Sequence, residues 1–127
     1  MNLPQGHQTI MPYLMLNGAS KFIEFLKDVF NAQLNSGMYK LAEDGTVRHA
    51  EIAIGGSTIM FTEATDQWPV QTANLFVYVE NADQTYIKAL ESGGTSIMEL
   101  SDQDYGRTCG VNDSFGNTWW ITSVSKV

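Results

Sequence analysis

The pattern of apolar and turn-forming residues in this 127-residue chain runs through the sequence twice. A strand candidate over residues 10–16 leads into an amphipathic helix, and three more strand candidates follow before the same order begins again. Residues 16–19 match 79–82, and residues 58–61 match 118–121, at an offset of about 60 residues. The sequence therefore predicts an α+β fold of two βαβββ repeats rather than a solenoid.

The first repeat is expected over about residues 9–63. Its helix carries apolar side chains at helical spacing on one face, namely Phe22, Ile23, Leu26, Val29 and Phe30. Asn17 is a candidate N-cap for this helix. Segments 33–40 and 46–54 are predicted as strands, and a short apolar strand over 58–62 closes the repeat.

The second repeat is expected over about residues 74–125, after a polar, aperiodic connector at 64–73. Asn81 and Gln84 resemble a capping box at the start of the second helix. The predicted apolar face of that helix consists of Tyr86, Ile87 and Leu90. The predicted strands that follow are 96–100, 107–111 and 118–123. We expect a single domain, 1–127, in which each mixed sheet has one face under its helix and curves around a shared cavity with the other.

Composition excludes several classes of partner. The formal net charge of −7 disfavours nucleic acid and anionic lipid. No apolar run approaches the roughly 20 residues that cross a bilayer, and the first ten residues do not resemble a secretory leader. Cys109 is the only cysteine, so no disulfide can form within the chain, and a cytoplasmic location is predicted.

Three stretches carry a family resemblance. The run Tyr105–Ile121 resembles the C-terminal signature of glyoxalase and bleomycin-resistance-like proteins of the vicinal oxygen chelate superfamily. Pro12–Leu14 together with Asn17–Ala19 resembles the first βα unit of that family. His49–Glu51 makes the chain most similar to the PhnB-like branch. The resemblance spans the chain after residue 9, and it implies a ligand pocket and a homodimer.

Three residues of the C-terminal signature are expected to be structural. Asp113 can cap the turn before the last strand, and Gly116 can take the positive φ that a tight hairpin requires. Cys109 is predicted to be a small buried hydrophobe, with Arg107 as the one basic neighbour able to lower its pKa.

The resemblance also locates the four strand positions at which metal-using relatives place His or Glu ligands. In this chain they fall on Pro12, Met60, Asn74 and Trp120. A register one residue away gives Tyr13, Phe61, Leu75 and Trp119 instead. Neither set offers the imidazole or carboxylate that Fe, Mn, Zn or Ni prefer. We therefore expect no metal cofactor and an apolar pocket wall.

The two histidines of the chain receive different interpretations. His7 is expected to be a solvated residue of the N-terminal tail. In the strand 48–54, apolar residues alternate with His49 and Glu51, so this pair should share the pocket face while Ala50, Ile52 and Ile54 pack under a helix. The pair can be hydrogen-bonded structurally, act as a general acid and base, bind a polar ligand group, or contribute to an unconventional metal site.

Trp119 and Trp120 are adjacent on a strand and must point to opposite faces, and we expect Trp119 in the core and Trp120 in the cavity. The candidate ligand-binding residues are Trp120, Met60, Tyr78, Phe76, His49 and Trp68. Their rings, with that of Tyr13, can stack a planar ligand, although aromatic residues in small β-rich domains often belong to the core.

Three functions remain open. The leading hypothesis is a metal-free dimer that binds a planar aromatic or cationic drug-like molecule. The alternative is a lyase or isomerase-type enzyme that uses His49 and Glu51, with or without a non-standard divalent metal. The third is an interaction domain whose cavity is filled by its own side chains.

Overall fold

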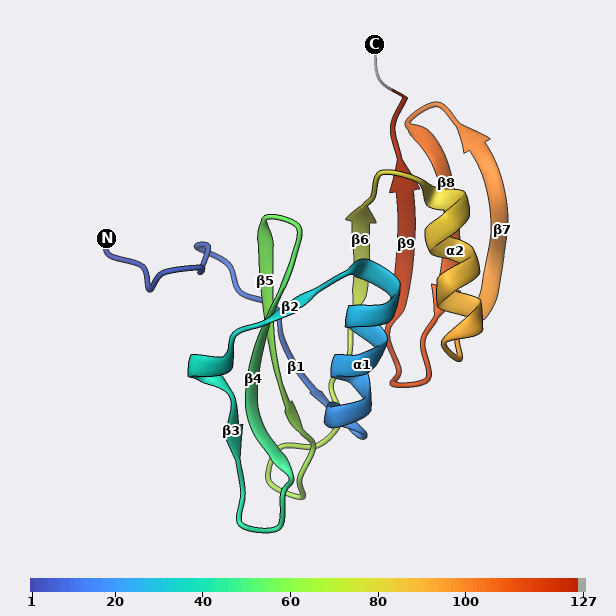
Figure 1. Cartoon of the computed structure of the whole chain (residues 1–127). Coiled ribbons are helices and arrows are strands. Elements are labelled where there is room, and N and C mark those ends of the chain that lie inside the picture. The colour runs from blue at the N-terminus through green and yellow to red at the C-terminus, as the bar shows by residue number, and fades with distance from the viewer. Residues whose placement is uncertain (126–127) are drawn as a thin grey trace. The chain divides into compact units, whose positions relative to one another are not determined.

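The computed structural model describes residues 1–125 and divides into two compact units, one from Met1 to Thr72 and one that begins at Ala73. Each unit contains one helix packed on one face of a mixed sheet (Figure 1). The two helices and two mixed sheets confirm the predicted α+β class. Within residues 1–125, neither helix is long and apolar enough to span a membrane.

The first unit holds one helix and five strands. Its elements are β1 (Tyr13–Leu16), α1 (Ala19–Phe30), β2 (Gln33–Leu34), β3 (Lys40–Leu41), β4 (Val47–Ile54) and β5 (Ser57–Glu63). The sheet order is β1-β5-β4-β2, with β3 also paired to β4, and β1 runs parallel to β5. The predicted continuous strand over 33–40 is wrong, because a 3-10 turn at Ser36–Met38 interrupts it. Asn35 favours this turn by accepting a hydrogen bond from the backbone of Gly37 at 3.2 Å.

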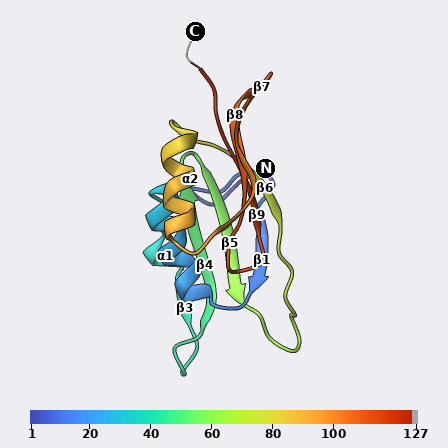
Figure 2. The ribbon, with the colours of Figure 1, turned by 90° about the vertical axis from the view of Figure 1, so that its right-hand side faces the viewer.

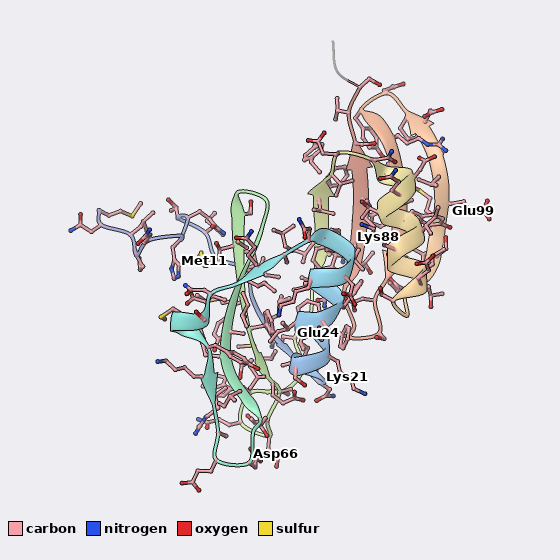
Figure 3. The ribbon with its side chains drawn as sticks, in the orientation of Figure 1. Met11, Lys21, Glu24, Asp66, Lys88 and Glu99 are labelled. Carbon is pink, nitrogen blue, oxygen red and sulfur yellow. The ribbon has the colours of Figure 1, made fainter. Side chains whose placement is uncertain are left out.

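Helix α1 covers one face of this sheet (Figure 2). The ring of Phe22 meets that of Phe61 on β5 edge-on, with centroids 4.9 Å apart. Most of the predicted apolar face of the helix is buried, and Phe25 is buried as well. Lys21 and Glu24 lie on the outer side of the helix (Figure 3).

The start of α1 corrects the expectation that Asn17 caps it. Gly18 is the N-cap residue, with φ of 88°, and as a glycine it has no side chain that could cap the helix. The carboxylate of Glu63, at the end of β5, accepts hydrogen bonds from the backbone of Gly18 at 3.0 Å and Ala19 at 2.9 Å. A carboxylate at this end also complements the helix dipole, so a residue distant in sequence replaces the local cap.

The second unit repeats the order with one helix and four strands. Its elements are β6 (Asn74–Tyr78), α2 (Ala82–Glu91), β7 (Thr95–Gln103), β8 (Gly106–Asn112) and β9 (Thr118–Ser123). The sheet order is β6-β9-β8-β7, with β6 parallel to β9. Asn81 caps α2 as predicted, because its side chain accepts from the backbone of Gln84 at 3.0 Å.

The buried face of α2 differs from the predicted one. Ile87 is 53% exposed, and the residues that α2 buries are Ala82, Thr85 and Ala89. Small side chains let a helix lie close to a sheet, and Gly94 shows how close: a Cβ there would stand 2.6 Å from Val111 and 2.7 Å from the carbonyl oxygen of Ala89. Apolar periodicity alone does not detect a face built from small residues.

The turn before β9 has the predicted scaffold role. Oδ1 of Asp113 accepts from the backbone of Phe115 at 2.8 Å and Asn117 at 2.9 Å, and Gly116 has a φ of 99°. Oδ2 of Asp113 accepts from Nδ2 of Asn117 at 3.0 Å and from the indole nitrogen of Trp119 at 2.8 Å. Trp119 is 2% exposed, so it belongs to the core as expected.

Candidate ligand-binding site

In each unit the sheet face opposite the helix is called the open face. On the first unit, strand pairing places Tyr13 and Glu51 beside Met60. His49 lies two residues from Glu51 and therefore shares this face. The alternate residues Ala50 and Ile52 are fully buried, and Ile54, the third residue expected under the helix, is half-buried.

Glu51 is the most buried charged group on the first open face. Its residue is only 1% exposed, and each carboxylate oxygen has an imidazole partner. Nε2 of His7 lies 2.7 Å from Oε1, and Nε2 of His49 lies 2.9 Å from Oε2. Burial by itself raises the pKa of Glu51, but the hydrogen bonds and charges of His49 and His7 outweigh it and hold the pKa below its ordinary value.

The contact with His7 corrects the expectation of a solvated tail. The segment Gly6–Gln8 is anchored beside β5, where the side chain of Gln8 donates to the carbonyl of Thr58 at 2.6 Å and accepts from its backbone nitrogen at 3.2 Å. The hydroxyl of Thr58 donates to the carbonyl of Gly6 at 2.6 Å. A cavity of about 210 Å³ lies between this segment and the sheet, with His7 and Glu51 in its wall.

The connector contributes to a second cavity of the first unit, of about 370 Å³. Tyr13 and Trp68 supply its aromatic wall, and Arg48 and Glu63 supply charge. A local turn holds Trp68, since its backbone nitrogen donates to Oγ1 of Thr65 at 2.9 Å and its carbonyl accepts from the backbone of Thr65 at 2.8 Å. Trp68 is thus an exposed aromatic residue at a formed cavity. The aperiodic sequence of its connector gave no indication of this turn.

The open face of the second unit is aromatic. Phe76 on β6 pairs with Trp120 on β9, and the ring of Phe76 lies tilted against those of Tyr78 and Tyr105 at centroid distances of 5.4 and 6.1 Å. Phe76 is 50% exposed and Tyr78 and Tyr105 are more so. Tyr105 was not among the expected binding residues, because it lies in the turn between two strands. Three rings and an indole therefore share one surface of this sheet.

The orientation of Trp120 depends on a glycine that the sequence analysis missed. A Cβ at Gly110, the residue paired with Trp120, would stand 2.6 Å from Cζ3 of its indole and 3.1 Å from Ile97. The six-membered ring of the indole therefore lies against Gly110 of β8, and its Nε1 donates to Oδ1 of Asn74 at 3.3 Å. A glycine inside a strand often marks such a close approach, and that signal was present in the sequence.

The positions of the family's metal ligands do not fit a metal. Pro12 and Met60 are neighbours, since the carbonyl of Pro12 accepts from the backbone of Met60 at 2.9 Å, and Asn74 is bonded to Trp120. These four residues provide one amide and one thioether but no imidazole or carboxylate. Across residues 1–125, no three His, Cys, Asp or Glu side chains are grouped as metal ligands. No chemical step is therefore assigned to a metal at these positions.

The second unit also has a polar surface hollow of about 740 Å³ at the start of α2. Tyr78 lines it beside Asp83 and Arg107, which form an ion pair with Nε and Oδ1 2.9 Å apart. Cys109, two residues from Arg107, is fully buried, and burial raises the pKa of its thiol to about 11. Cys109 is the buried hydrophobe that the sequence predicted.

The fold and the signature residues together define a class of protein. The model of the glyoxalase/bleomycin resistance protein/dioxygenase superfamily matches residues 9–121. The chain belongs to this superfamily, as its sequence motifs indicated.

Individual relatives support the same placement. The chain is 28% identical over 122 residues to an uncharacterised protein of Mycobacterium bovis, covering 87% of this chain and 79% of that protein. A PhnB protein from Bacillus cereus has a TM-score of 0.71 at 20% identity, covering 92% of this chain and all of that one. TnmS3, an antibiotic binding protein from Streptomyces sp. CB03234, has a TM-score of 0.70 at 16% identity, covering 94% of this chain and all of that one. At these identities the two solved structures establish the fold alone.

Proposed function

We propose that this protein is a metal-free, homodimeric binding protein for a planar aromatic or cationic drug-like molecule. The observation that carries the proposal is the open face of the second unit, where Phe76, Tyr78 and Trp120 present aromatic surface to solvent. Exposed aromatic clusters mark binding surfaces far more often than isolated apolar side chains do. A planar ligand stacked on these rings gains on the order of 1 kcal/mol for each ring, in addition to burial.

Charge favours a cationic ligand. The formal net charge of −7 attracts cations over a long range. An aromatic face attracts the same ligands at short range, because the ring quadrupole is negative above the plane. TnmS3, which shares the fold, is an antibiotic binding protein, and this similarity supports a drug-like ligand.

The remaining parts of the proposal rest on separate arguments. The absence of imidazole and carboxylate ligands at the four strand positions supports binding without a metal cofactor. The family resemblance supports a homodimer, which would cover apolar surface that each unit exposes. The single buried thiol of Cys109 suits a reducing cytoplasm, and the acidic charge argues against nucleic acid or membrane as a partner.

Tryptophan fluorescence tests the proposal directly. Trp68 and Trp120 are reached by solvent, whereas Trp119 is buried, so a ligand on an open face should quench part of the emission. Planar aromatic cations and their neutral analogues are titrated into the protein. Phe76→Ala should weaken binding about five- to tenfold, since it removes about 1 kcal/mol of stacking.

Ile87→Ala is the matched control, because Ile87 is as exposed as Phe76 but lies on α2. It should leave the affinity unchanged. No saturable quenching by any compound in the panel, or equal losses in the two variants, would contradict the proposal. Sedimentation or light scattering of the unliganded protein tests the dimer separately.

A second function, a lyase or isomerase-type enzyme, is favoured by one observation. His49 and Glu51 form a hydrogen-bonded imidazole–carboxylate pair of 2.9 Å, and such pairs serve in general acid–base catalysis. Turnover that disappears in His49→Ala, while affinity for the same compound is kept, would favour this alternative over simple binding.

A further inference from the structure

The carboxylate of Glu51 determines which nitrogen of each histidine carries a proton. Because its pKa is lowered, Glu51 is ionised at neutral pH, and an ionised carboxylate only accepts hydrogen bonds. Both of its imidazole contacts are made by Nε2, from His7 at 2.7 Å and from His49 at 2.9 Å. Each Nε2 must therefore carry the hydrogen. In a neutral imidazole this leaves Nδ1 with a free lone pair.

The Nδ1 atom of His49 is open to a ligand. Among residues 1–125, no group is hydrogen-bonded to this atom. Every buried side-chain nitrogen or oxygen in that range has a partner, so Nδ1, which has none, must be reached by solvent. The side chain of His49 is 24% exposed and lies beside the ring of Tyr13, with centroids 6.2 Å apart. A molecule that stacks on Tyr13 would thus lie next to a basic nitrogen.

His7 holds the other oxygen of the same carboxylate. The anchoring of Gly6–Gln8 to Thr58 fixes the place from which His7 reaches Glu51. A carboxylate bonded at both oxygens has little freedom to rotate, so His49 keeps one orientation and one tautomer. The arrangement resembles a catalytic pair in which a buried carboxylate orients an imidazole, with a second imidazole as an additional support.

We infer that His49 is a proton-accepting site of the first open face, with Nδ1 as the accepting atom and with Glu51 and His7 as its positioning residues. The chemical class it would take is a planar molecule with an acidic O–H or N–H group. The proton moves from that group to Nδ1, which leaves the ligand with one negative charge more and creates an imidazolium beside Glu51. The ligand class rests on the proposed binding function, but the state of His49 does not.

Other charged groups face this cluster and belong to its electrostatics. Lys40 on β3 is paired with His49 across the strands and so lies on the same face. Tyr13 is the titratable neighbour on β1, and Met60 on β5 is neutral.

Nitrogen NMR of the histidines tests the inference without any ligand. The chain has only two histidines, so protein labelled with ¹⁵N-histidine gives two imidazole spin systems, which His7→Gln assigns. The experiment is run at pH 9, well above the usual imidazole range near 6.5. We expect both rings to carry their hydrogen on Nε2. A hydrogen on Nδ1 of His49 would overturn the inference.

Two variants test the positioning residues. In Glu51→Gln one oxygen accepts and the amide nitrogen donates, so one of the two rings must move its hydrogen to Nδ1. His7→Ala removes the donor to Oε1 and should change His49 from the pure Nε2–H form to a mixture of tautomers, because the carboxylate can then rotate. Gln5→Ala alters the same segment without removing either imidazole and should have no effect. Unchanged His49 signals in His7→Ala would refute the role of His7, even if Glu51→Gln fails to fold.

Reactivity supplies a second measurement. Diethyl pyrocarbonate, used as the probe, acylates an unprotonated imidazole nitrogen and releases carbon dioxide and ethanol. It should modify His49 at Nδ1, after which the acylated ring gives up its Nε2 hydrogen. Modification at Nε2 instead would show that Glu51 does not hold that atom. Neither result depends on whether aromatic cations quench tryptophan, so failure of the binding proposal and failure of this inference are distinguishable.

Discussion

The adjacent residues Trp119 and Trp120 allow core and surface roles to be compared within one strand. Trp119→Phe keeps an aromatic ring but removes the indole N–H that donates to Oδ2 of Asp113 at 2.8 Å, in a site that is 2% exposed. That oxygen keeps only its bond from Asn117. Loss of a buried hydrogen bond to a charged acceptor, together with the void left by the smaller ring, should lower the free energy of unfolding by about 2–4 kcal/mol.

Trp120→Phe is the matched change on the opposite face. It removes one 3.3 Å bond to Asn74 from a partly exposed ring, so the loss of stability should stay near 0.5 kcal/mol. Urea unfolding followed by far-UV circular dichroism measures both variants, and the slopes should agree with that of the unchanged protein. Equal losses, or a larger loss for Trp120→Phe, would refute the assignment of the two faces. For ligand affinity the order should be reversed. Trp120→Ala should weaken binding more than a change at Trp119 does.

Three further changes have defined outcomes. Gly110→Ala places a Cβ 2.6 Å from the Trp120 indole, so about 1–3 kcal/mol of stability should be lost and the tryptophan emission should shift; unchanged unfolding and emission would contradict the close approach. Because the pKa of Glu51 is lowered on folding, its ionised form stabilises the protein above the unfolded pKa, and this stability is lost as the pH falls through the folded value. The difference in unfolding free energy between the unchanged protein and Glu51→Gln should therefore shrink as the pH falls below the ordinary carboxyl value of 4.5. Since burial raises the pKa of Cys109 to about 11, a thiol reagent at pH 8 should react only after denaturant is added, and rapid reaction of the native protein would show that the thiol is accessible.

The parts of the fold that could be predicted are those with a strong local period. The face of α1 and the last strand at Thr118–Ser123 have such a period, and both lie where they were expected. The segment 33–40 has no such period, and Asn35 breaks it through a side-chain bond that competes with strand pairing. The face of α2 was misplaced for a different reason, because its helix buries small residues and leaves Ile87 exposed.

The contact between His7 and Glu51 spans 44 positions and follows no period, so strand and helix patterns could not locate it. A different argument was available from the sequence. An acidic residue in a strand whose neighbours are buried needs a donor for each oxygen, because a buried carboxylate without partners is costly. His49 can satisfy one oxygen from two residues away, which leaves one donor missing. The only other histidine of the chain is His7, and the structure supplies that donor from a segment without regular structure. Counting the hydrogen-bond needs of Glu51, rather than the periodicity of its strand, is therefore what connects the N-terminal segment to the open face of the first sheet.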